Sequence, residues 1–134
     1  MFRVGNAHLF FVGVQAMLKK GKGWRIGWQD KAEIYQGLIG ADDWAFEVSA
    51  SEMEDFCRLL AEITDTMKAM AEHLMEEESI SCEVESPLLW LGAEGYVDNY
   101  RLRIIFNQGR GVEGAWESDA VQGLVQGVQS LKSF

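Results

Sequence analysis

Side chains that could carry out chemistry are few in this sequence of 134 residues. The histidines and cysteines are His8, His73, Cys57 and Cys82. His73 and Glu77 stand four residues apart, which places both on one face of a helix. A protein metal site normally needs three or four converging ligands, and only neighbouring helix glutamates stand near this pair. We therefore expect an exposed helix histidine and no metal site.

Nucleophilic catalysis and phosphate binding are not indicated either. A reactive serine or cysteine needs a base beside it. Cys57 falls on the apolar face of a predicted helix, and Cys82 alternates with Ile80 and Val84 on a predicted strand. Both are expected to be buried free thiols, typical of a reducing compartment. The run Gly109–Gly111 is too short for a phosphate-binding loop. We predict a protein that is not an enzyme and binds no cofactor.

The charge distribution helps to decide between nucleic-acid binding and protein binding. The net charge is −9, yet the first 28 residues hold five basic side chains and no acidic one. Single-strand binders combine a basic groove with aromatic platforms. The candidate nucleic-acid contacts are Lys19, Lys20, Lys22, Arg25, Arg101 and Arg103. The outward strand positions also include Glu47, Glu83, Glu85, Glu113 and Glu117. Because such an acidic surface repels phosphate, nucleic-acid binding is an alternative rather than the main prediction.

The element that organises the predicted fold is a long amphipathic helix, expected from about Ser49 to Glu78. Its apolar residues recur in steps of three and four, which gives one apolar face. They are Met53, Phe56, Cys57, Leu60, Ile63, Met67, Met70, Leu74 and Met75. Ser49 and Glu52 have the spacing of a capping box, and Val48 is placed to pack on Met53. We expect this helix to close the first half of the molecule.

Strands are predicted on both sides of the helix, because apolar residues there alternate with polar ones. Before the helix they are expected at 24–28, 34–39 and 44–48. After it they are expected at 80–85, 88–91, 100–106 and 112–117, with turn residues from Gly92 to Asn99. Trp24, Trp28 and Trp44 share faces with apolar neighbours and are predicted in the core. Trp90 lies between two leucines, so the sequence does not decide whether its side chain points into the core or to the outer face of the sheet.

A shorter helix is expected at about 119–132, capped by Ser118 or Asp119. Ala120, Gly123 and Gly127 form a strip of small residues on it, which suggests close approach to another backbone. Because such a strip also suits self-association, the candidate interaction surface comprises Trp90, Gly123 and Gly127.

The order of these elements predicts an α+β fold, with a curved antiparallel sheet in two strand-rich repeats, each followed by a helix. We interpret residues 17–134 as a single domain and residues 1–16 as an N-terminal extension. A signal peptide and an extra edge strand are the other interpretations of the extension. No apolar run is long enough to span a bilayer, and the free thiols favour a cytoplasmic location.

Several segments together resemble a known family. They are Gly23–Trp28, Gly37–Gly40 before Trp44, Glu54–Leu59, Ser81–Glu83, Leu88–Leu91 and Glu113–Trp116. From about Met17 to Phe134 the chain resembles a small cyanobacterial family known as domain of unknown function 1818. The resemblance implies a fold similar to the Whirly-type regulators that bind single-stranded DNA, which are built from repeated units of four strands and a helix. It implies no catalytic residue.

The function that fits these observations is a non-catalytic protein-interaction or assembly module, since an acidic surface suits basic protein partners. Its protein partner is unknown, a membrane is not expected, and a homo-oligomer is possible. Single-stranded nucleic acid is one alternative ligand. The other is an apolar small molecule in a cup lined by Trp24, Trp44 and Met70, although these residues also suit an ordinary core.

Overall fold

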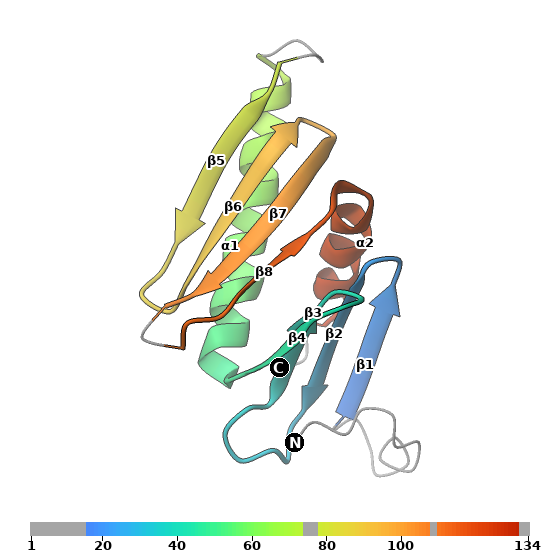
Figure 1. The fold of residues 1–134 in the computed structure, drawn as a ribbon, viewed down its shortest axis with the longest axis vertical. Coiled ribbons are helices and arrows are strands. Elements are labelled where there is room, and N and C mark those ends of the chain that lie inside the picture. Colours follow the sequence, from blue (N-terminus) through green and yellow to red (C-terminus); the bar gives the residue numbers. More distant parts are fainter. Residues whose placement is uncertain (1–15, 74–77, 108–109, 132–134) are drawn as a thin grey trace.

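The chain forms two four-stranded antiparallel sheets, each followed in sequence by a helix (Figure 1). This computed structural model describes residues 16–73, 78–107 and 110–131. The first repeat comprises β1 (Ala16–Gly21), β2 (Trp24–Gln29), β3 (Gly37–Gly40), β4 (Ala45–Val48) and α1 (Ala50–Ala71). The second comprises β5 (Ile80–Glu85), β6 (Leu89–Tyr96), β7 (Asn99–Phe106), β8 (Glu113–Trp116) and α2 (Ser118–Gln129). The predicted α+β class with two strand-rich repeats is confirmed.

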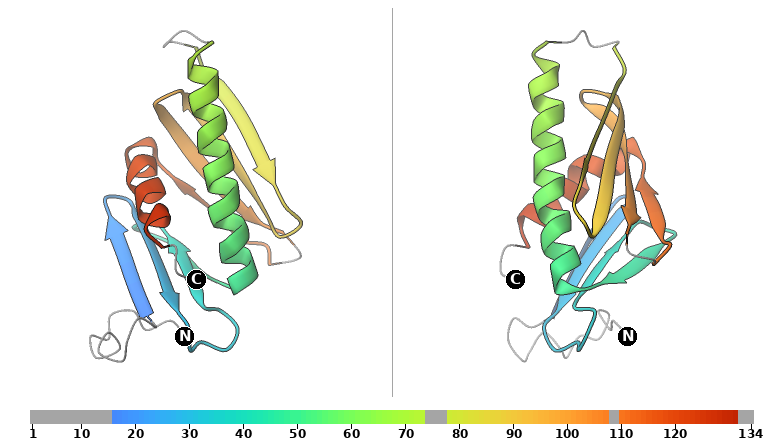
Figure 2. Two further views of the ribbon diagram at one scale, coloured as in Figure 1. Left: turned by 180° about the vertical axis from the view of Figure 1, so that it is seen from behind. Right: turned by 90° about the vertical axis from the view of Figure 1, so that its left-hand side faces the viewer.

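The two helices lie on the same side of the sheets, but each packs mainly on strands of the other repeat (Figure 2). Helix α1 contacts β5 and β6, whereas α2 contacts β1, β2 and β7. The long helix ends the first repeat in sequence, as expected, but it does not pack mainly on the sheet of that repeat. Its apolar face is covered by the second sheet, and no helix among the described residues lies on the opposite face of that sheet.

Tryptophans join the two repeats at the point where the β3–β4 turn meets β8. The fully buried Trp116 donates its indole N–H to the Gly40 carbonyl at 2.9 Å. In return, Trp44 donates its indole N–H to the Ala115 carbonyl at 3.1 Å. The Trp116 ring also lies 5.0 Å from Trp44 and 5.8 Å from Phe56, between centroids. The core is thus centred between the repeats.

Helix α1 begins as predicted and ends earlier than predicted. Ser49 accepts from the Glu52 backbone N–H, and Glu52 accepts from the Ser49 backbone N–H, so the capping box is confirmed. The helix ends at Ala71 with Lys68 in its last turn, a basic residue where the helix dipole favours one. The expected end at Glu78 is wrong because the apolar pattern continues past the turn toward β5. Residues 74–77, with Glu77, lie outside the described part of the chain.

Two strands of the first sheet differ from the prediction. Strand β1 was not expected, because Met17–Lys20 does not alternate apolar and polar residues. Strand β3 begins at Gly37 rather than Ile34, and Ile34 is 66% exposed. Gln36 holds the preceding loop by donating to the Ala32 carbonyl and accepting from the Ala50 N–H. The predicted strand was too long because this loop contains exposed apolar residues.

Strand β6 is longer than expected and continues to Tyr96, through residues that had been interpreted as a turn. Gly92 and Gly95 lie within the strand, and both stand close to neighbouring residues. A Cβ on Gly92 would lie 2.3 Å from the Trp90 ring. Gly95 has a φ of +142° and pairs with Tyr100. The glycines indicated a turn in the sequence, but here they permit close contacts inside a sheet.

Helix α2 begins at Ser118, and its N-cap is Glu117, one residue before the predicted cap, without a capping side-chain hydrogen bond. The small-residue strip on α2 approaches another backbone only at Ala120, which lies against Gly23, whereas Gly123 and Gly127 contact the indole ring of Trp24. A Cβ on either Gly123 or Gly127 would lie 2.5 Å from an atom of the Trp24 ring. The strip therefore has a partner within the chain. Neither helix, in the ranges that the structure describes, has the length and apolar character of a membrane span.

Candidate functional site

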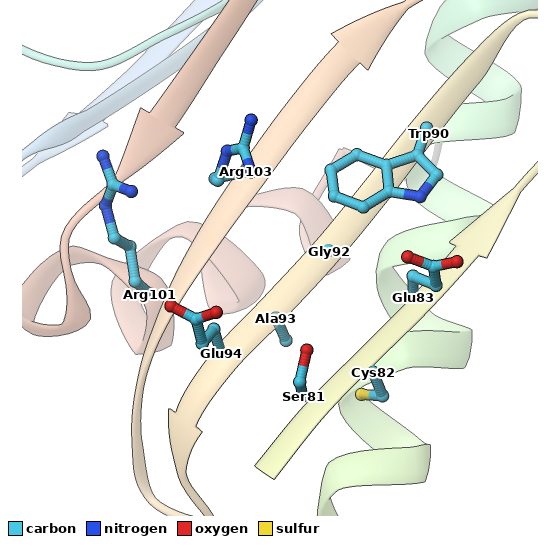
Figure 3. Close-up of a pocket in the computed structure, with 9 residues that line it drawn as sticks. All are labelled: Ser81, Cys82, Glu83, Trp90, Gly92, Ala93, Glu94, Arg101 and Arg103. Atoms are coloured by element: carbon cyan, nitrogen blue, oxygen red, sulfur yellow. The ribbon is translucent and has the colours of Figure 1, made fainter. Parts of the chain in front are cut away.

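The exposed face of the second sheet carries the strongest candidate site, and Trp90 is at its centre (Figure 3). Leu89 and Leu91 are fully buried beneath the sheet. Because side chains alternate along a strand, Trp90 points to the opposite face. The question left open by the sequence is thereby answered: Trp90 is half-buried on the face that no helix covers.

The Trp90 ring is held flat against the sheet by its neighbours. Gly92 is buried beneath the ring, and any larger residue there would collide with it. Arg103 pairs with Gly92 across the strands, and its guanidinium lies 5.6 Å from the centroid of the Trp90 ring. This is a cation–π distance, worth about 0.5–1 kcal/mol at an exposed position. The arrangement presents a cation and an aromatic surface side by side.

Arg101 lies on the same face, one cross-strand row away from Arg103. It pairs with Glu94 on β6, and its Nε lies 3.3 Å from Oε2 of Glu117. Arg101, Arg103 and Glu94 border a shallow hollow of about 200 Å³. Ser81 and Glu83 from β5 complete its border. The structure thus brings together three of the predicted site residues: Trp90, Arg101 and Arg103.

Acidic side chains outnumber basic ones on this face. The outward carboxylates are Glu83, Glu85, Glu94, Glu113 and Glu117, all exposed. Only Arg101 and Arg103 oppose them among the strand residues that the structure describes there, and Arg101 is paired with Glu117. A long phosphate backbone would meet net repulsion on such a surface. A partner with its own basic and apolar side chains is better matched to it.

The other predicted basic residues do not join this site. Arg25 donates to the Ala41 and Trp44 carbonyls and so holds the β3–β4 turn. Lys22 lies 3.3 Å from Asp119 at the start of α2. Lys19 and Lys20 are on β1, at the edge of the first sheet. The continuous basic groove that the nucleic-acid alternative needs is therefore not assembled from these residues.

Arg110 is an important residue that the sequence did not single out. Its guanidinium lies 2.6 Å from Oε1 of Glu52 and donates to the Glu47 carbonyl at 2.6 Å. It also lies over the rings of Tyr35 and Phe106, at 5.1 and 5.2 Å. Arg110 thus links the β7–β8 loop to the start of α1. Its ion-pair and hydrogen-bond partners, Glu52 and Glu47, are distant in sequence, so no local pattern could have identified them.

The thiols lie where their reactivity is low. Burial raises the pKa of Cys57 to about 12, and the Glu54 carboxylate adds to this shift. Burial also raises the pKa of Cys82, whose Sγ lies 3.3 Å from Sδ of Met67. Burial, and then the nearby Cys82, raises the pKa of Tyr100. In the described residues, no group of three or more histidine, cysteine, aspartate or glutamate side chains is arranged to hold a metal ion.

The comparisons place this fold and surface in a family. A family model described as a domain of unknown function (DUF1818) matches residues 19–131, a range that contains the whole candidate site. The chain therefore belongs to this family.

A crystal structure of a protein with unknown function from the DUF155 family of Prochlorococcus sp. NATL2A is similar to the chain. It shares 29% identity and a TM-score of 0.82, over 87% of this chain and 98% of the other. The comparison with curated proteins finds no match.

Proposed function

We propose that this protein is a non-catalytic protein-interaction module, and that the exposed face of the second sheet binds the partner. The observation that carries this proposal is the Trp90 ring, held flat over Gly92 beside Arg103 on a sheet face that no helix covers. Aromatic and arginine side chains are enriched among the residues that dominate protein interfaces.

The surrounding carboxylates define the chemistry of the partner. A basic side chain of the partner would lie beside Glu83 or Glu94, while an apolar or aromatic group would lie on the Trp90 ring. Arg103 would donate hydrogen bonds to a carboxylate or a carbonyl of the same segment. A partner segment that alternates basic and apolar residues meets these requirements, and a uniformly anionic polymer does not.

The test is a pull-down from native cytoplasmic extract, with and without nuclease. Wild-type protein should capture partners that nuclease does not release, and Trp90→Ala should lose them. Gly92→Ala should also weaken capture, because its Cβ would displace the Trp90 ring. Ile34→Ala is the control, since Ile34 is exposed on another part of the molecule. Chemical shifts of the labelled protein should change at residues 90–94 and 101–105 when a captured partner is added.

Capture that is unchanged in Trp90→Ala would contradict the proposal. Capture that disappears with nuclease would favour single-stranded nucleic acid instead. The observation supporting that alternative is the stacked Arg103 and Trp90 pair, because bases stack on such platforms. The likeness to Whirly-type regulators that the family resemblance implied also supports this alternative.

A groove between α1, α2 and the β6–β7 turn supports the apolar-ligand alternative at a different place from the one expected. It encloses about 480 Å³, and its apolar lining comes from Met67, Val97, Tyr100 and Val125. Trp24 and Trp44 do not line it, since their rings pack against Gly127 and Gly114. We propose a cytoplasmic location on the basis of the two free thiols.

A further inference from the structure

The two sheets end in edge strands of opposite charge. Among the strands that the structure describes, β1 is an outer strand of the first sheet and β5 is an outer strand of the second. Each has six residues, and the two lie on opposite flanks of the molecule (Figure 1). Their inner faces are covered by α2 and α1 respectively. Edge strands present backbone donors and acceptors to which another strand can pair.

Strand β1 carries Lys19 and Lys20 and is followed by Lys22, without an acidic residue. Strand β5 carries Glu83 and Glu85, without a basic residue. Lys20 and the two glutamates are exposed. Lys20 pairs with Arg25 on the face opposite the buried Ile26, so it points away from the helices, as do Glu83 and Glu85.

We propose that the β1 edge of one copy of this chain pairs with the β5 edge of a second copy. Opposite charges directly across paired strands are favourable, whereas like charges are unfavourable. Two β1 edges would bring lysines together, and two β5 edges would bring glutamates together. The charges therefore oppose pairing of like edges and favour pairing of unlike edges.

The apolar residues of the two strands support the same pairing. Cys82 and Val84 are half-buried on the helix side of β5, and Met17, which pairs with Trp28, is half-buried on the helix side of β1. A neighbouring strand would complete the burial of these residues on the helix side. Because each copy uses a different edge, the contact is heterologous. It leaves one free edge of each kind, so further copies can add to form a ring or an open chain.

The first test uses the wild-type protein alone. Sedimentation velocity should show association that increases with protein concentration and weakens in about 1 M salt, where the Debye length is about 3 Å. Carbodiimide cross-linking of mixed ¹⁴N- and ¹⁵N-labelled protein should give mixed-isotope peptides that join Lys19, Lys20 or Lys22 to Glu83 or Glu85. A monomer at every soluble concentration would overturn the proposal.

Charge reversal is the second test. Lys20→Glu alone and Glu83→Lys/Glu85→Lys alone should each remain monomeric, whereas an equimolar mixture of the two variants should associate again. Lys31→Glu and Glu33→Lys are the controls, because both side chains are exposed and lie on neither edge strand. Circular dichroism checks that each variant is folded. Association that persists in both reversed variants would refute the β1–β5 contact.

This inference needs no other protein and does not involve Trp90, although Glu83 of the β5 edge also borders the proposed partner-binding hollow. Trp90→Ala should therefore associate like the wild type while losing its captured partners. Loss of both properties in Trp90→Ala would contradict the separation of the two surfaces.

Discussion

At the scale of single residues, Trp90 depends on a residue that has no side chain. Its ring is flat because Gly92 leaves space for it, and Arg103 extends beside the ring from the next strand. The sequence suggested a turn at this glycine, since glycine and nearby polar residues commonly mark turns. Only the pairing of β6 with β7 shows that the glycine contributes to a binding surface.

Cys57 gives a prediction at the same scale. Its pKa is about 12 in the folded protein and near the ordinary value of 9.0 in the unfolded chain. Between these values the unfolded state loses its thiol proton first, so the stability that Cys57 contributes is present below pH 9 and is lost as pH rises toward 12. Wild-type protein should lose about 1 kcal/mol more than Cys57→Ala between pH 8 and pH 10.

The measurement is urea unfolding of both proteins at the two pH values. Other groups that titrate in this range, including Cys82 and Tyr100, are common to both proteins and cancel in the comparison. Equal losses of stability in wild type and Cys57→Ala would show that the thiol ionises as easily in the folded state as in the unfolded one.

At the scale of elements, two glycines lower the helix propensity of α2 and allow Trp24 of β2 to contact it closely. Gly127 and Gly123 each weaken the helix by about 1 kcal/mol relative to alanine. Because these glycines have no Cβ, the Trp24 ring can lie directly on the helix backbone. The strip was recognised in the sequence, but its partner was not, because Trp24 is about one hundred residues away and was assigned to the core of the first sheet.

Gly127→Ala should therefore destabilise the protein, although alanine is the better helix former. The added Cβ would lie 2.5 Å from the Trp24 ring, and overpacking of this kind costs about 1–3 kcal/mol. In a Trp24→Leu background the same substitution should become neutral or stabilising. Urea unfolding of the four proteins measures the reversal, and a stabilising effect of Gly127→Ala in the wild type would contradict the contact.

At the scale of the whole molecule, Arg110 connects the repeats through its ion pair with Glu52, an acid that also belongs to the capping box of α1. Side-chain exposures of 26% for Arg110 and 10% for Glu52 indicate that water screens this pair only partly. Losing a hydrogen bond to a largely buried charge costs about 1.5–3 kcal/mol.

Arg110→Met should reduce the free energy of unfolding by about 2–3 kcal/mol. Arg58→Met is the control, since its ion pairs with Asp55 and Glu62 are 3.4 and 4.0 Å long and more exposed. It should cost no more than about 0.5 kcal/mol. A double-mutant cycle with Glu52→Gln, followed by urea unfolding, measures the coupling of Arg110 to Glu52. A coupling energy near zero would contradict their link.

The sequence predicted the parts of the fold that depend on local patterns. The alternation at Trp24–Trp28 and Tyr100–Phe106, and the capping box at Ser49, were all found where expected. Local patterns failed where a long-range contact decides the structure. Strand β1 forms because it pairs with β2, although Met17–Lys20 shows no alternation. Of the candidate site, Trp90, Arg101 and Arg103 were named from the sequence, whereas the part played by Gly92 and the grouping of these residues follow from the register of β6 and β7.

Each helix packs mainly on the sheet of the other repeat, and this arrangement has a consequence for synthesis of the protein. When residues up to Ala71 have left the ribosome, the apolar face of α1 has not yet met β5 and β6, which cover it in the finished molecule. Phe56, Ile63 and Met67, all buried in the end, are then exposed to solvent. We therefore expect the nascent first repeat to be prone to aggregation until the second repeat emerges and covers this face.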